Sequence, residues 1–526
     1  MLVNEFLEYS ARIYPDKVAL VCRGQRLTYK EIDNASSAIA RSLVNEGFQR
    51  HDRGVIYLDN CLEAVISLFG ILKAGGIFVI VNPKVKDKKL AYIISDCQAK
   101  ILVSDWYHLK QKTEAFSDLS CLDSFLIIDS EKYPELEELG NRRILFYYDE
   151  LASNISSSAI ISRSIDIDLA GLIYTSGSSG TPKGVMLTHH NMVSAAESII
   201  RYLGNTSEDI VINTLPLAFD YGLYQVLMTF KFGGTIILEN GFIFPEQIMN
   251  LIVKEKVTGW PIVPTIAAIL CRQSNLVQHD FSRLRYISST GQVLFTNHIA
   301  RLQKSFPNVK IFSMYGLTEC KRVLYLPPDE LLKRPASVGK AMPNTEAFIV
   351  DKDNVEIFEA ETPGELVVRG ANVMQGYWNL PEDTARALRP GRYPFERVLY
   401  TGDLFKKDNE GFLYFLGRKD DMIKTSGLMV SPKEIENVLC EIDDVVEAAV
   451  IGVEDEILGQ AIKAFIHLNT GCKVTEKDVI NYCRKHLEDQ AIPKYVEFCD
   501  SLPKNESEKI QKKVLQQRIQ GGNDNL

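Results

Sequence analysis

Hydrophobic and polar positions follow a regular cycle over the first part of the chain. Residues 27–48 (LTYKEIDNASSAIARSLVNEGF) have apolar side chains at helical spacing after a threonine, and residues 54–59 (GVIYLD) are a short apolar run. A second helical stretch covers 61–76 and closes on two glycines, and a second apolar run, 77–83, stops at a proline. The pattern predicts strands that alternate with helices.

Similar apolar runs recur at 99–105, 124–129, 235–240 and 310–316. Short and almost continuously apolar strands are typical of a parallel sheet that helices cover on both faces. The sequence therefore predicts an α/β fold in which a large N-terminal body is built from α/β subdomains.

The pattern of polar and apolar residues changes after about Pro343. Three segments, 345–358, 362–370 and 411–420, alternate in polarity between Asp, Asn and Gly turns, which indicates an antiparallel or barrel-like β subdomain. The last hundred residues mix strand and helix patterns and predict a small mobile α+β domain. We expect an N-terminal core over 1–416 and a C-terminal domain over 417–526, with a polar tail beyond Lys512 that frays.

Composition narrows the choice of partner. The 526 residues are 46% hydrophobic and 24% charged, and their net charge of −9 argues against nucleic acid and anionic membranes as partners. The most apolar windows, 64–72 and 77–81, are far shorter than the roughly 18 residues that span a bilayer. Ten single cysteines without a CxxC pair indicate a reducing, cytoplasmic location. A chain of this length is expected to form about three domains with a cleft between them.

The most informative segment is LIYTSGSSGTPKGVMLTHHN, residues 172–191. An apolar strand leads into glycines that let backbone amides converge on an anion, hydroxyls that add donors, and a lysine. We expect it to bind a phosphate group through Thr175, Ser176, Gly177, Ser178, Ser179, Gly180, Thr181 and Lys183. The alternative is a surface linker rich in Ser and Gly. The spacing matches neither GxxxxGK[ST] nor GxGxxG, so it supports neither an ordinary NTPase nor a Rossmann dehydrogenase.

This loop resembles the phosphate-binding signature of the adenylate-forming superfamily, which comprises acyl-CoA synthetases, luciferases and the adenylation domains of nonribosomal peptide synthesis. The resemblance covers nearly the whole chain, because seven further segments occur in the family's order: 27–32, 72–83, 315–319 (YGLTE), 364–370, 400–403 (YTGD), 417–420 (GRKD) and 503–509. It implies ATP and Mg²⁺ as cofactors.

The resemblance also implies roles for single residues. Gly291, Gly316 and Thr318 would contact ATP, Tyr315 would pack on adenine, Glu319 would hold Mg²⁺, Asp403 would accept the ribose hydroxyls, Arg418 would reach the nucleotide, Asp420 would be the hinge, and Gly427 would line a pantetheine tunnel. Without the resemblance, Glu319 could be a solvated side chain, Asp403 part of an ordinary turn, and residues 417–420 a charged linker.

Lys509 aligns with the family's catalytic lysine, which bridges the substrate carboxylate and the α-phosphate. The sequence departs from the family pattern here, since Glu508 replaces the usual Gly and Asn505 the usual Thr. Three other lysines lie close by and leave an alternative open: Lys504, Lys512 and Lys513.

Residues 215–225 (LPLAFDYGLYQ) bear on the choice of acid. Phe219 stands where many acyl-CoA ligases have a histidine, and Asp220 follows it, as in amino-acid adenylation domains. A buried carboxylate without a partner is costly, so Asp220 suggests a cationic guest, with Tyr224 and Met314 as the pocket walls. The alternative is that Asp220 caps the following helix.

Taken with the segments 319–328 and 334–346, the chain most resembles stand-alone ligases that adenylate L-proline and load a separate carrier protein, as in anatoxin-type toxin pathways. The expected activity is conversion of an amino acid to aminoacyl-AMP and transfer to the phosphopantetheine thiol of that carrier. The first alternative is an acyl-CoA ligase for a neutral acid. The second is a catalytically silent scaffold that keeps the fold.

Overall fold

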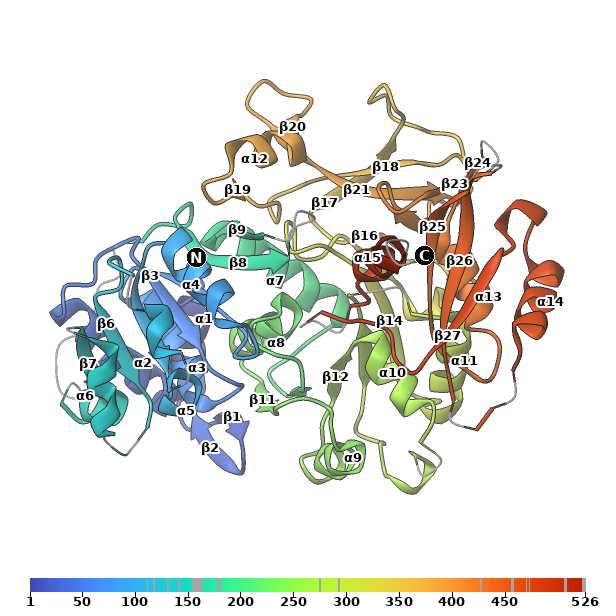
Figure 1. Cartoon of the computed structure of the whole chain (residues 1–526). Coiled ribbons are helices and arrows are strands. Elements are labelled where there is room, and N and C mark those ends of the chain that lie inside the picture. Colours follow the sequence, from blue (N-terminus) through green and yellow to red (C-terminus); the bar gives the residue numbers. More distant parts are fainter. Residues whose placement is uncertain are drawn as a thin grey trace.

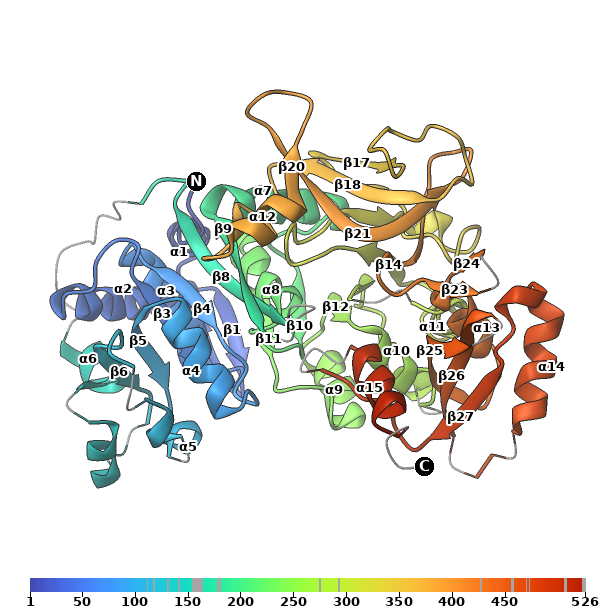
Figure 2. The same ribbon diagram turned by 45° about the horizontal axis from the view of Figure 1, so that its top comes forward.

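The computed structural model describes residues 1–110, 112–116, 119–129, 131, 133–140, 142–153, 164–176, 181–273, 276–291, 294–425, 428–455, 458–469, 471–472, 474–505 and 509–522. Within these residues the strands form four sheets, here called sheets A to D. Figures 1 and 2 show strands β5 (Ala99–Ser104) and β6 (Ser124–Ile127) of sheet B and the C-terminal domain at opposite ends of the molecule, with much of sheet A between them.

Sheet B has the order β19-β9-β8-β4-β3-β5-β6-β7. Its strands are β3 (Arg53–Tyr57), β4 (Ile77–Ile80), β5 (Ala99–Ser104), β6 (Ser124–Ile127), β7 (Arg143–Phe146), β8 (Leu169–Ser176), β9 (Pro182–Thr188) and β19 (Gly376–Tyr377). The predicted apolar runs form parallel pairs from β4 through β7, and β8 and β9 pair antiparallel.

Sheet A has the order β16-β15-β14-β13-β12-β10-β11-β1-β2. Its strands are β1 (Val18–Cys22), β2 (Gln25–Thr28), β10 (Ile210–Asn213), β11 (Thr235–Leu238), β12 (Gly259–Ile262), β13 (Tyr286–Ser289), β14 (Lys310–Tyr315), β15 (Leu324–Leu326) and β16 (Lys340–Ala341). Strand β1 pairs with β11 in parallel although more than 200 residues separate them, so the start of the chain ties the two α/β subdomains together.

Helices cover these sheets, as the amphipathic pattern predicts. They are α1 (Glu5–Ile13), α2 (Tyr29–Asn45), α3 (Leu62–Lys73), α4 (Asp87–Asp96), α5 (Trp106–Leu109), α6 (Tyr147–Ser153), α7 (His189–Leu203), α8 (Asp220–Phe232), α9 (Pro245–Lys254), α10 (Pro264–Leu270) and α11 (Thr296–Ser305). Thr28 and Glu31 form a capping box at the start of α2, which explains why the helix begins where the sequence places it. Among the described residues, no helix combines the length and the apolar character that crossing a bilayer requires.

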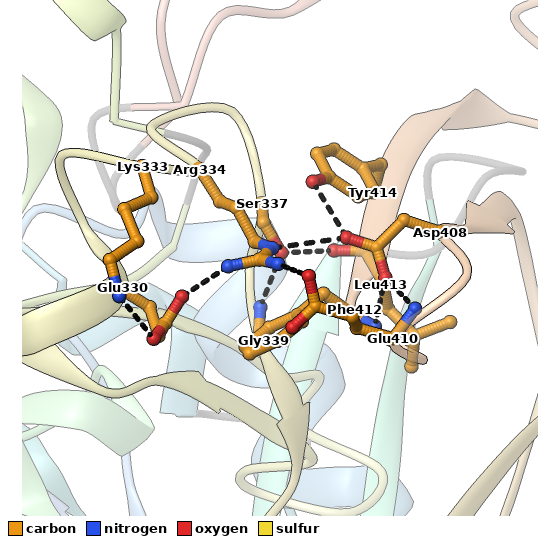
Figure 3. A network of polar contacts seen from close by, with 10 residues as sticks. All are labelled: Glu330, Lys333, Arg334, Ser337, Gly339, Asp408, Glu410, Phe412, Leu413 and Tyr414. Carbon is orange, nitrogen blue, oxygen red and sulfur yellow. Dashed lines mark hydrogen bonds and ion pairs between the residues drawn. The ribbon is translucent and has the colours of Figure 1, made fainter.

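Sheet C is the predicted antiparallel β subdomain. It contains β17 (Thr345–Val350), β18 (Gly364–Gly370), β20 (Leu388–Pro390), β21 (Arg397–Lys407) and β22 (Leu413–Arg418), and α12 (Pro381–Ala387) precedes β20. A polar network around Arg334 joins its β21–β22 turn to the segment between β15 and β16 of sheet A (Figure 3). Arg334 Nε donates to Asp408 Oδ2 over 3.1 Å, and the other guanidinium nitrogens meet Glu330 and Glu410. Sheet C is therefore fixed against the body that carries the cleft.

Sheet D belongs to the C-terminal domain, and residues 419–422 link it to sheet C. Its elements are β23 (Ile423–Thr425), β24 (Leu428–Val430), α13 (Pro432–Leu439), β25 (Val445–Asp455), β26 (Gly459–Leu468), α14 (Glu476–His486), β27 (Tyr495–Cys499) and α15 (Lys512–Gly522). The expectation of a fraying tail is wrong for 512–522, because Leu515 of α15 is fully buried against Ile451 and Phe465. The boundary at 416/417 stays a prediction.

Candidate functional site

A cavity of about 910 Å³ lies where sheet A, the β8–β9 hairpin, sheet C and the C-terminal domain meet. It brings together eight of the residues that the sequence singled out: Thr175, Lys183, Asp220, Thr318, Glu319, Arg418, Asp420 and Lys509. Five separate stretches of chain supply them, which is why periodicity alone could not place them together.

Several predicted residues lie elsewhere. Gly177, Ser178, Ser179, Gly180 and Gly427 are outside the described residues, as is the side chain of Ser176. Thr181 is exposed just before β9, and Gly291 has φ +94° beside the Phe219 ring. Tyr224 and Met314 are buried behind Asp220 and do not line this cavity, so their part in substrate binding stays a prediction.

Asp403 lies at the centre of a polar cluster beside the cavity. Its Oδ2 accepts a 2.5 Å hydrogen bond from the Tyr315 hydroxyl, and its Oδ1 lies 3.0 Å from Arg418 Nε without the alignment of a hydrogen bond. Burial raises the pKa of Asp403 to about 6, although Arg418, Tyr315 and Lys509 oppose the rise. Oδ1 is buried beside Arg418 and accepts no hydrogen bond from the described residues.

The Tyr315 ring packs among the side chains of sheet C. Its centroid lies 4.9 Å from that of Phe405 and 6.2 Å from that of Phe415, and burial raises its pKa well above the usual value. Gly316 follows it, and a side-chain carbon there would lie 2.3 Å from the Lys321 carbonyl. Only glycine permits this close approach of two backbone segments.

Glu319 is oriented by a residue that the sequence analysis missed. The Tyr377 hydroxyl donates to Glu319 Oε1 over 2.8 Å, and Lys183 Nζ lies 5.3 Å from the centre of the Tyr377 ring. Lys183 also pairs with Asp383 at 3.1 Å. The signal was present in the sequence as the segment 376–378 (GYW), but nothing in it indicates contact with a residue almost sixty positions earlier.

Lys509 faces the cavity from the C-terminal domain. Its backbone N–H donates to Asn505 Oδ1 over 2.9 Å, and the Asn505 N–H donates to the Lys509 carbonyl over 2.9 Å. Asn505, which replaces the family's usual threonine, therefore shapes the turn. Two of the alternative lysines have carboxylate partners within their own domain: Lys504 pairs with Glu447 at 2.6 Å and Lys512 with Glu436 at 2.7 Å.

Asp220 has a partner that the charge argument did not anticipate. Lys321 Nζ donates to the Asp220 carbonyl over 2.7 Å and lies 3.3 Å from Asp220 Oδ2. The premise that the carboxylate is unpaired, and so calls for a cationic guest, is wrong. The capping alternative is also wrong, since Phe219 is the N-cap of α8 and has no side-chain cap.

Lys321 adopts a backbone conformation that side-chain-bearing residues avoid. Its φ is +61°, which costs roughly 1 to 3 kcal/mol and is typical of functional sites. Burial lowers the pKa of its ammonium to about 7, and Asp220 opposes this shift. Lys321 lies in the segment 319–328, but its partner Asp220 lies 101 residues earlier in the chain. Only the tertiary structure brings the two residues together.

Two family models cover most of the chain. The AMP-binding enzyme model matches residues 7–378, and the AMP-binding enzyme C-terminal domain model matches 434–509. The chain belongs to the AMP-binding enzyme family. It is an ATP-dependent, AMP-forming acid–thiol ligase.

Curated relatives and solved structures match over almost the full length. A long-chain-fatty-acid–CoA ligase of Bacillus subtilis is 32% identical over 98% of this chain and 94% of its own, and that of Salmonella typhimurium is 31% identical over 99% and 95%. The anthranilate CoA ligase AuaEII with anthranoyl-AMP matches with a TM-score of 0.89 at 25% identity, covering 98% of this chain and 97% of its own. ATP-bound MatB from Rhodopseudomonas palustris matches with a TM-score of 0.84 at 28% identity, covering 99% of both. The α/β body, the β subdomain and the small C-terminal domain are thereby confirmed.

Proposed function

We propose that the chain activates a carboxylic acid with ATP and transfers the acyl group to the thiol of coenzyme A. The observation that carries this proposal is the cavity that gathers Lys183, Glu319, Arg418 and Lys509 around one space. Lys183, Arg418 and Lys509 are three of the cations that line it, and they suit a triphosphate that reacts at its α-phosphorus. The curated relatives are named as CoA ligases, and the pairing of Asp220 with Lys321 removes the main argument for an ammonium-bearing substrate.

In the first step the carboxylate oxygen of the acid attacks the α-phosphorus, and the bond to the bridging oxygen breaks to release pyrophosphate. Lys509 would stabilise the negative charge that builds between the carboxylate and the α-phosphate. Asp403 fits the ribose because its buried Oδ1 lacks a hydrogen-bond donor. Lys183 would leave its ion pair with Asp383 and bind the phosphates of ATP instead.

Glu319 would hold Mg²⁺, which neutralises phosphate charge when bound. Its carboxylate suits a cation that is commonly bound through one or two carboxylates and the substrate's phosphates. Tyr377 fixes the orientation of this carboxylate through Oε1, and among the described residues no hydrogen bond reaches Glu319 Oε2.

In the second step the thiol sulfur attacks the acyl carbonyl, AMP leaves and the thiol proton is released. Lys509 must first move away from the reacting carbon. Asp420 is exposed at the link between sheets C and D, which suits a hinge about which the C-terminal domain turns and brings the Gly427 segment to the cleft.

A second candidate is the amino-acid ligase, with L-proline as substrate and the phosphopantetheine arm of a carrier protein as thiol. It is favoured by Asp220, which lines the cavity at the position where amino-acid adenylation domains have an aspartate. Thioester formation with CoA and with a phosphopantetheinylated carrier protein, measured side by side, separates the two candidates.

The test is ATP–pyrophosphate exchange across alkanoic, hydroxy, aromatic and amino acids, L-proline included, followed by CoA consumption with the best acid. Exchange with at least one acid is expected. Lys509→Ala should lower exchange by about 100-fold or more, while the acyl-adenylate supplied directly should still react with CoA. Lys477→Ala, on the exposed face of α14, is the matched control and should keep full activity. Absence of exchange with every acid would contradict the proposal.

A further inference from the structure

Three ionisable side chains form a buried charge cluster behind the cavity: Asp220, Lys321 and Arg322. Their exposed fractions are 8%, 3% and 2%. None of the steps above uses Lys321 or Arg322. Moving charged side chains out of water costs free energy, so the presence of this cluster requires an explanation.

Asp220 is the member of the cluster that reaches the cavity. Lys321 lies behind it and donates to both its carbonyl and its Oδ2. In the part of the chain that the structure describes, no hydrogen bond reaches the other carboxylate oxygen, Oδ1. One acceptor therefore faces the space where the acid must lie.

The charge balance of the cluster disfavours a cationic guest. Arg322 and the protonated form of Lys321 accompany a single carboxylate in this cluster, and Arg322 Nε is buried without a hydrogen-bond partner among the described residues. An ammonium group at Asp220 Oδ1 would be repelled by Lys321 and Arg322, whereas a hydroxyl could donate its hydrogen bond without adding charge.

The surroundings of the cluster also disfavour a long alkyl chain. The Lys321 ammonium lies 4.2 Å from the centre of the Tyr224 ring and 5.5 Å from that of Tyr221, so lysine and rings fill the space behind Asp220. Both rings are almost fully buried. An alkyl chain directed there would have to displace them and lie against charged groups.

We propose that Lys321 is a positioning residue that sets the substrate class: by holding and neutralising Asp220 it selects an acid with an uncharged hydrogen-bond donor, such as a hydroxyl, near the reacting carboxylate. This inference rests on the proposed function and adds the identity of the acid's substituent. The positive φ of Lys321 and the close approach of Gly316 to the Lys321 carbonyl hold Lys321 in place.

The experiment compares kcat/KM for three acids that share one carbon skeleton, namely the skeleton with the highest pyrophosphate exchange. They carry a 2-hydroxyl, a 2-amino group or no substituent. The wild-type chain should prefer the hydroxy acid over the amino acid by about tenfold or more, the discrimination expected from an added charge beside a buried cation. Preference for the amino acid would overturn the proposal.

Lys321→Met should then lower the hydroxy-to-amino ratio by about tenfold, because Asp220 becomes an unpaired carboxylate that attracts an ammonium. The double variant D220N/K321M removes both charges and leaves Arg322, so it should not show the gain in relative activity toward the amino acid that Lys321→Met shows. Lys256→Met is the matched control, since Lys256 also has a left-handed backbone, φ +55°, but is exposed. An unchanged ratio in Lys321→Met, as in Lys256→Met, would refute the role of Lys321.

Two measurements distinguish a variant that does not fold from a change in substrate preference. Thermal unfolding identifies variants that do not fold, and the wild-type comparison decides the substrate class without any variant. Loss of exchange with every acid in the wild type would refute the proposed function, whereas exchange with the wrong preference refutes only the role of Lys321.

Discussion

Asp403 illustrates how burial prepares a single residue for a ligand. Its folded-state pKa of about 6 exceeds the usual value of 3.8, so the folded protein holds this proton more tightly than the unfolded chain does, and stability falls as the pH rises from 3.8 to about 6. A ribose hydroxyl that donates to Asp403 favours the ionised form instead. Nucleoside binding and deprotonation of this one carboxyl are therefore coupled.

We expect adenosine affinity to fall by about tenfold between pH 7 and pH 5, because the ionised fraction of a group with this pKa falls by about that factor. Adenosine avoids the titration of a phosphate. Isothermal titration calorimetry measures the affinity, and Asp403→Asn should bind more weakly with no step in this range. A wild-type affinity that does not change with pH would contradict the coupling.

Sequence and structure agree on which residues carry charge in the cleft and disagree on their partners. The motifs predicted that Lys183, Glu319, Arg418 and Lys509 share one site, because a triphosphate requires them together. Tyr377 and Lys321 escaped notice because each acts through a contact across many residues, with Glu319 and Asp220. Periodicity and spacing report local structure, and such pairings arise only when distant elements pack.

At the scale of elements, the ion pairs around α13 support the segment that carries Lys509. Glu436 is 6% exposed and accepts from Lys512 at the start of α15 and from the Val450 N–H of β25. Burial alone would raise the pKa of Glu436, but Lys512 and Lys433 outweigh it and lower the pKa. The stabilisation from this carboxylate is therefore present above its unfolded pKa and is lost as the pH falls.

Glu436→Ala should destabilise the C-terminal domain by about 3 kcal/mol, the usual cost of leaving buried cations unpaired. The same change should slow adenylation, because α15 no longer anchors the turn that presents Lys509. Differential scanning calorimetry and pyrophosphate exchange measure the two effects. Glu434→Gln, exposed on the same helix, should change stability by less than about 0.5 kcal/mol; equal effects of both variants would show that the pair is unimportant.

The elements themselves were largely predictable. Strands such as β4 and β14 and helices such as α2 and α3 lie where apolar periodicity and capping residues place them. Helix α15 was not predicted, because its sequence is polar and only Leu515 is buried against sheet D. The pairing of β1 with β11 of sheet A could not be predicted either, because the sequence of a strand does not indicate which strand lies beside it.

At the scale of the whole molecule, the two-step reaction requires one interface to form and break. The described contacts of the C-terminal domain with α11 and its N-cap include an ion pair of Arg301 with Asp443 at 2.9 Å, a hydrogen bond from Asn297 to the Cys440 carbonyl, and Lys433 at 4.1 Å from the centre of the Phe295 ring. Asp443 is 92% exposed and such pairs contribute little. The contact is weak enough for the domain to leave it.

Asp420→Pro should therefore uncouple the steps. Proline fixes φ near −65° and so restricts the backbone rotation that a hinge requires. Pyrophosphate exchange should persist, while thioester formation with CoA should fall by about tenfold or more in single-turnover measurements. Asp421→Pro, one residue along the same link, tests whether the position is specific; equal loss in both steps would indicate a folding defect instead of an uncoupled hinge.

The tethered lysines have a consequence for product release. Lys504 and Lys512 carry Glu447 and Glu436 with them, whereas no carboxylate partner of Lys509 lies among the described residues, so the domain that turns away takes the charge of Lys509 out of the cleft. Pyrophosphate is held there chiefly by cations. Once that charge departs, the electrostatic attraction on the leaving anion weakens, and its escape becomes linked in time to the arrival of the thiol.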